Sequence, residues 1–144
     1  MNSKAGFTLL EILVVVLIIT IIATIVGVKV FPQLGKAKTA AAIAQISIFE
    51  QALDLYRLDS GRYPTSEQGL KALCEKPVIS PVPQRYSDEG YLKKGLPLDP
   101  WEHKYIYLVP GSDGSAYEII SYGSDCEPGG SGEAADISSI DLAK

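Results

Sequence analysis

The sequence predicts an α+β fold in which a long N-terminal helix packs on a small antiparallel β-sheet and a loop closes the chain. Three observations predict it. Residues 7–28 form an apolar run, residues 36–58 carry apolar side chains at helical spacing, and residues 104–122 hold two strand-like runs around a turn. The chain of 144 residues is long enough for one modest globular domain beyond the apolar run.

Composition excludes two classes of binding site. The formal net charge is −4 and the isoelectric point is about 5.0, with no basic stripe. Nucleic-acid affinity comes from clustered Lys and Arg, so no nucleic-acid partner is expected. A structural zinc site needs about four nitrogen or sulfur ligands. This chain has one histidine and two cysteines, so a structural zinc site is not expected.

The apolar run at the N-terminus is long enough to cross a bilayer. Phe7 to Val28 would span roughly 33 Å as a helix at ~1.5 Å per residue. The run lacks the shorter apolar core and following cleavage site of a secretory signal. Glu11 lies inside it, and a carboxylate at membrane depth is costly and usually has a partner. The alternative is that Glu11 sits at headgroup level and is solvated.

The segment Lys4-Ala5-Gly6-Phe7-Thr8-Leu9-Leu10-Glu11-Ile12 resembles the class III signal of type IV pilins and type II secretion pseudopilins. The resemblance implies that a prepilin peptidase cleaves between Gly6 and Phe7 and methylates the new amino terminus of Phe7. It also implies that Glu11 pairs with the Phe7 amine of a neighbouring subunit in a filament.

A pilin-like division of the chain follows from this resemblance. Residues 1–6 are expected to be a cytoplasmic leader, residues 7–31 a transmembrane half-helix, and residues 32–144 a periplasmic globular domain. Pro32 and Gly35 are expected to interrupt the helical pattern near the junction.

The second half of the long helix is predicted from its spacing. A core-facing stripe repeats every three or four residues, at Ala42, Ile46, Phe49, Leu53 and Tyr56. Ala41, Ile48, Ala52 and Leu55 are expected to widen this stripe. The helix should stop near Asp59–Gly61, where glycine suits a C-terminal cap.

Shorter elements follow the helix. Thr65 and Gln68 fit a capping box before a short helix that ends ahead of Pro77, and residues 77–90 are predicted to form a loop. Strands are predicted at 104–109 and 116–122. Trp101 is expected in the core.

Three segments together narrow the resemblance: Tyr63-Pro64-Thr65, Glu67-Gln68-Gly69-Leu70 and Leu96-Pro97-Leu98-Asp99-Pro100-Trp101. They look like those of the major, G-type pseudopilins of type II secretion. That family implies a homopolymer anchored in the bacterial inner membrane by a single span. It also implies minor pseudopilins, an inner-membrane assembly platform and a secretion ATPase as partners. The alternative is a type IV pilin for adhesion, motility or DNA uptake.

The C-terminal loop, residues 123–136, is glycine-rich and acidic. By resemblance to G-type pseudopilins it would bind one Ca²⁺, with Asp125 and Asp136 as side-chain ligands. Tyr122 and Ser131 would contribute backbone oxygens. The family usually has glycine where this chain has Cys126. The thiols of Cys74 and Cys126 could form a disulfide outside the cytoplasm, or both could be free.

An enzyme is not expected. His103 is the sole histidine, and neither a nucleophile elbow, a phosphate loop nor an HExxH motif is present. His103 lies among charged residues before a strand, which predicts a solvated surface position. Asp99 is explained by the turn that an Asp-Pro pair favours.

Overall fold

The computed structural model describes residues 7–142, and within them it gives no side-chain placement for residues 25–32. The chain divides after Lys36 into two compact units. The predicted boundary, after residue 31, lies five residues earlier. The leader, residues 1–6, lies outside the described residues.

One helix, α1, runs from Leu9 to Ser60. It continues through Pro32 and Gly35, so the helix is one continuous element, as expected, and is not broken at either residue. The first unit contains the N-terminal part of this helix, whose described side chains are exposed from residue 7 to residue 24.

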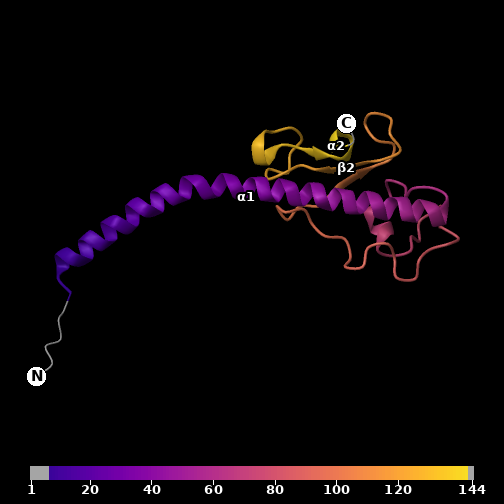
Figure 1. The fold of residues 1–144 in the computed structure, drawn as a ribbon. Helices are drawn as coiled ribbons and strands as arrows, with labels where there is room; N and C mark the ends of the chain where they lie inside the picture. The colour runs from indigo at the N-terminus through magenta and orange to yellow at the C-terminus, as the bar shows by residue number, and fades with distance from the viewer. Residues whose placement is uncertain (1–6, 143–144) are drawn as a thin grey trace, which may run out of the picture. The chain divides into compact units, whose positions relative to one another are not determined.

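The second unit, residues 37–144, is built on the C-terminal part of α1 (Figure 1). Its three-stranded antiparallel sheet has the order β1-β2-β3, with β1 at Ile106–Leu108, β2 at Glu118–Ser121 and β3 at Ile137–Ser138. Tyr107 pairs with Ile119, and Ser121 pairs with Ile137. Two 3₁₀ turns, η1 (Leu70–Leu73) and η2 (Gly132–Ala134), and the short helix α2 (Ser139–Leu142) complete the unit.

The predicted stripe of α1 forms the centre of the core. Ala42, Ile46, Phe49, Leu53 and Tyr56 are all buried, as is Ala52. The sheet lies on one side of this part of α1, and much of the loop between η1 and β1 lies on the other (Figure 1). Phe49 packs edge-on against Tyr105 at 5.0 Å between ring centroids. Tyr56 packs edge-on against Tyr86 and Tyr91.

The predicted width of the stripe was wrong at three positions. Ala41, Ile48 and Leu55 are exposed, and the last two keep 47% and 53% of their surface in solvent. The sheet and the loop flank the face centred on Phe49 and bury it. The apolar face of α1 that carries Ile48 and Leu55 stays uncovered in this unit.

The end of α1 and the capping box were predicted correctly. Gly61 takes φ +78°, and its N–H donates to the Arg57 carbonyl at 2.8 Å, which closes the last turn as a left-handed cap. The Thr65 and Gln68 N–H groups each donate to the other residue's side-chain oxygen, at 3.0 and 3.2 Å.

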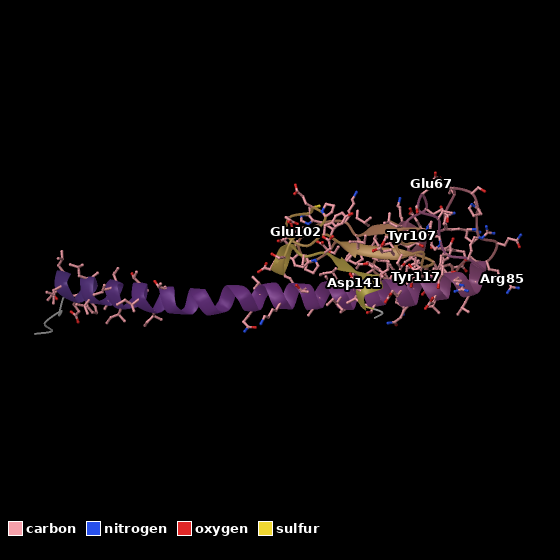
Figure 2. The ribbon with its side chains drawn as sticks, turned by 90° about the horizontal axis from the view of Figure 1, so that it is seen from above. Glu67, Arg85, Glu102, Tyr107, Tyr117 and Asp141 are labelled. Atoms are coloured by element: carbon pink, nitrogen blue, oxygen red, sulfur yellow. The ribbon has the colours of Figure 1, made fainter. Side chains whose placement is uncertain are left out.

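The predicted strands are confirmed but are shorter than expected, and β3 was not predicted. Trp101 packs against the core, as expected. In Figure 2 the labelled Tyr107 and Tyr117 lie within the packed unit, at 6.2 Å between ring centroids. Two buried polar atoms among the described residues have no hydrogen-bond partner, Trp101 Nε1 and the Tyr105 hydroxyl.

Candidate functional site

The first candidate site is the N-terminal turn of α1. Thr8 precedes the helix, and its hydroxyl accepts a hydrogen bond from the Glu11 N–H at 3.2 Å. This is an N-cap, which satisfies one of the free N–H groups at a helix start. Glu11 therefore stands in the first turn of α1, where the helix dipole favours a negative charge.

The capping role of Thr8 was not foreseen from the sequence. The signal was present, because Thr8 and Glu11 have the Ser/Thr-x-x-Glu spacing of a capping box. The cap gives Glu11 a defined place on the helix. Gly6, the residue before the expected cleavage point, lies outside the described residues, and the expected pairing partner is Phe7 of another subunit.

Apolar surface follows this turn along α1. Between Phe7 and Ile22 the large apolar side chains each expose between 46% and 82% of their surface. Among the residues that the structure describes, no helix combines the length and hydropathy required for a membrane span.

A second exposed apolar surface lies on the C-terminal part of α1. It consists of Ala37, Ala41, Ala44, Ile48, Leu55 and Leu58, which repeat at intervals of three and four with Gln51 in the series. We call this set the outer stripe. Leu58 exposes 80% of its surface. Alternation of three and four is the spacing by which one helix packs along another.

The C-terminal loop, residues 123–136, is the third candidate site. Asp125 Oδ1 accepts the Glu127 N–H at 3.3 Å, and Asp136 Oδ2 accepts the Gly129 N–H at 3.0 Å. These bonds use one oxygen of each carboxylate, and both side chains are exposed. The Ser131 carbonyl accepts the Ala134 N–H at 3.2 Å. Tyr122 is half-buried at the start of the loop.

The donor set of this loop is compatible with a hard cation. Its available atoms are carboxylate and carbonyl oxygens, which are the ligands that Ca²⁺ takes, in sets of about 6–8. Within residues 7–142 no three side chains of the His, Cys, Asp or Glu types come together as a metal-binding group. Two carboxylates would therefore need backbone carbonyls and water to complete the coordination.

The two cysteines are free thiols in this structure rather than a disulfide. Cys74 is partly buried and Cys126 is exposed. Burial, reinforced by the neighbouring Glu75 carboxylate, raises the pKa of the Cys74 thiol, which disfavours its reactive thiolate form.

His103 is not the solvated surface residue that the sequence predicted. Its ring is half-buried, and Nδ1 lies 3.0 Å from the Gly123 carbonyl oxygen at the start of the C-terminal loop. The local charge pattern gave no sign of this contact, because its partner is 20 residues away.

Comparison with known proteins agrees with these features. Residues 29–140 match the family model described as "Type II secretion system (T2SS), protein G", and residues 1–27 match the "Prokaryotic N-terminal methylation motif". The chain is 44% identical to the type II secretion system core protein G of Pseudomonas aeruginosa over 140 residues, with 97% of each chain covered. It is 41% identical to that of Escherichia coli K12, with 89% of this chain and 87% of the relative covered.

A solved structure shows the same fold. The crystal structure of the major pseudopilin from the type 2 secretion system of enterohaemorrhagic Escherichia coli superposes with a TM-score of 0.68 at 39% identity, covering 78% of this chain and 95% of that one. These matches favour type II secretion over the type IV pilin alternative. The chain belongs to the type II secretion system protein G family, the major pseudopilins.

Proposed function

We propose that this chain is the structural subunit that polymerises into the periplasmic pseudopilus of a type II secretion system. Before assembly, residues 7–31 anchor it in the bacterial inner membrane, and residues 32–144 lie in the periplasm. Its assembly partners are other copies of itself, minor pseudopilins, the assembly platform and the secretion ATPase. The absence of a catalytic constellation in the sequence agrees with a purely structural role.

The observation that supports polymerisation is the apolar surface that each subunit exposes. Large exposed apolar patches on a soluble surface mark interaction sites. The outer stripe lies on the face of α1 that the sheet leaves uncovered, and its spacing suits a second helix of the same kind. A copy of this chain presents such a helix, so that the contact repeats from subunit to subunit.

Changes within the outer stripe test this contact. Leu55→Glu places a charge in the proposed helix interface at a position that is exposed in the subunit. We expect normal melting of the detergent-solubilised subunit, loss of filaments by electron microscopy, and loss of secretion in complemented cells. Leu55→Met is the matched control and should assemble. Normal filaments from Leu55→Glu would contradict the proposed interface.

The N-terminal turn supplies the second element of assembly. Cleavage after Gly6 leaves a cationic amine on Phe7, and the Glu11 carboxylate of a neighbouring subunit offsets the cost of burying it. The Thr8 cap supports this role, because it holds Glu11 in the first helical turn. Mass measurement of the native protein tests processing: loss of residues 1–6 and one added methyl group are expected together.

Ca²⁺ bound in the C-terminal loop would order this loop for assembly. Asp125 and Asp136 would hold the cation, with carbonyl oxygens of Tyr122 and Ser131. Binding to the folded form alone stabilises it by RT ln(1 + [L]/Kd). We expect EDTA to lower the melting temperature and added Ca²⁺ to restore it; identical curves in both would argue against the site.

A further inference from the structure

A buried carboxylate connects the Asp-Pro-Trp turn to the end of β2. Asp99 exposes only 4% of its surface. Its Oδ1 accepts the N–H groups of Trp101 and His103 at 3.0 and 2.8 Å, and its Oδ2 accepts the Ser121 hydroxyl at 2.6 Å. A buried carboxylate with three donors is fixed in place, because each donor offsets part of the cost of its burial.

The same group of residues holds the backbone where the C-terminal loop begins. The Ser121 hydroxyl oxygen accepts the Gly123 N–H at 3.3 Å, and His103 Nδ1 lies 3.0 Å from the Gly123 carbonyl oxygen. A carbonyl oxygen only accepts hydrogen bonds, so Nδ1 of His103 carries the proton and donates. Both the N–H and the carbonyl of Gly123 are therefore bound by side chains of the group.

Gly123 is also the point where the two ends of the loop meet. It takes φ +65°, and a Cβ at this position would lie 2.5 Å from the Glu133 carbonyl oxygen. The next residue, Ser124, donates its N–H to that same carbonyl at 2.9 Å. Fixing Gly123 therefore fixes where the chain leaves β2 and where residue 133 returns.

We propose that Asp99, Ser121 and His103 are positioning residues that preset the conformation of the C-terminal loop before any cation binds. We call these three residues the loop clamp. The clamp acts from outside the loop through the backbone of Gly123, and none of its members belongs to the proposed ligand set. The clamp is tested by two measurements. Cation affinity rests on the proposed Ca²⁺ site, whereas hydrogen exchange at the Ser124 N–H does not.

His103 is the member best suited to a test. It is half-buried, and its side chain hydrogen-bonds directly to the Gly123 carbonyl oxygen. His103→Leu retains bulk and removes the donor. His103→Asn restores a short side-chain N–H donor. Lys104→Ala changes an exposed neighbour on the same segment and serves as the control.

Hydrogen exchange of the full-length protein in detergent with EDTA is the first measurement. For His103→Leu we expect exchange of the Ser124 N–H to rise about tenfold, the effect of losing one hydrogen bond that holds the segment. The Ile119 N–H in β2 should be unchanged, which separates a local effect from global unfolding. His103→Asn should recover most of the protection, and Lys104→Ala should match the wild type.

Cation affinity, measured by titration with Ca²⁺ alone, is the second measurement. His103→Leu should weaken it several-fold, with recovery in His103→Asn. Exchange at Ser124 equal to that of the wild type in His103→Leu would overturn the clamp. So would equal loss of protection at Ser124 and Ile119, since that marks a general packing role. If the wild type binds no Ca²⁺, the proposed cation site fails, and the exchange data still decide the clamp.

Discussion

Within residues 7–142, two residues other than glycine hold a left-handed backbone conformation, Glu102 at φ +71° and Cys126 at φ +58°. Such a conformation costs an L-residue about 1–2 kcal/mol, and glycine adopts it freely. Glu102 ends the Asp-Pro-Trp turn and points outward (Figure 2). Cys126 lies in the C-terminal loop and is exposed.

Replacing either residue by glycine should stabilise the protein. The relief of strain exceeds the extra freedom that glycine gives the unfolded chain, so Glu102→Gly and Cys126→Gly should each raise stability by about 0.5 kcal/mol. Thermal melting of the detergent-solubilised protein measures the change. Glu127→Gly is the control, because Glu127 has no left-handed conformation to relieve, and it should be neutral or destabilising.

Glu118 is a buried carboxylate that connects three segments. Its Oε2 accepts the Ser112 N–H at 3.0 Å and its Oε1 accepts the Ser138 hydroxyl at 2.7 Å. Burial raises the pKa of this carboxyl, but the hydrogen bonds from Ser112 and Ser138 outweigh burial and lower the pKa overall. The ionised form therefore stabilises the fold.

This lowered pKa predicts a pH dependence. The contribution of Glu118 is present above the unfolded-state pKa, about 4.3, and is lost as pH falls through the lower folded-state value. Glu118→Gln should cost about 1–3 kcal/mol at pH 7, because the amide nitrogen cannot accept one of the two bonds. The melting temperature of the Glu118→Gln variant should also fall less between pH 6 and pH 3 than that of the wild type. Parallel curves for the two proteins would contradict this assignment.

At the scale of elements, the two faces of α1 show what periodicity does and does not specify. Apolar residues at helical spacing occur on the core face and on the outer stripe alike. Phe49 is buried and Leu55 is exposed, although both fit an apolar helical pattern. Only the position of the sheet and the long loop decides which stripe becomes core.

Gln68 of the capping box also makes hydrogen bonds outside its own turn. Gln68 is buried, and its Nε2 donates to the carbonyls of Ile79 and Pro81 at 2.8 and 3.0 Å. It therefore ties the start of the loop that follows η1 to the Thr65 turn. This side chain satisfies backbone groups in three places.

Truncating Gln68 should destabilise the globular unit. Gln68→Ala leaves two carbonyls and the Thr65 N–H without their partner, at about 1–3 kcal/mol for an unsatisfied buried group, reduced where water can reach them. Urea unfolding measures the loss. Glu67→Ala is the control, because the neighbouring Glu67 is exposed and projects from the surface (Figure 2); equal losses in the two variants would show that the hydrogen bonds of Gln68 are not the cause.

At the scale of the whole molecule, we propose that the Glu11 carboxylate serves assembly rather than folding of the subunit. The bond to Thr8 is made by the backbone N–H of Glu11, and its side chain is exposed. Glu11→Leu should leave membrane insertion and the melting temperature unchanged and should reduce ordered filaments at least tenfold, since the amine of Phe7 then lacks its partner. Glu11→Asp, which keeps the charge, should retain part of the assembly. Fractionation and electron microscopy measure the two properties, and normal filaments from Glu11→Leu would refute the pairing.

The sequence by itself determined the features that are local along the chain. The long helix, its stop at Gly61, the Thr65–Gln68 capping box and the antiparallel pair of strands all follow from residue spacing, caps and turn residues within a few positions. The motif around Phe7 and Glu11 and the turn at Asp99 likewise identified the family correctly, because such motifs are short and contiguous.

Only the tertiary structure decided what depends on contacts between distant segments. In the structure Ile48 and Leu55 are exposed, and the short strand β3 pairs with β2. His103, expected at the surface, instead donates a hydrogen bond to the Gly123 carbonyl. Burial and long-range hydrogen bonds depend on which segments meet in space, and a pattern of neighbouring residues does not encode that meeting. The loop clamp is such a feature, because its members come from two segments and act on a third.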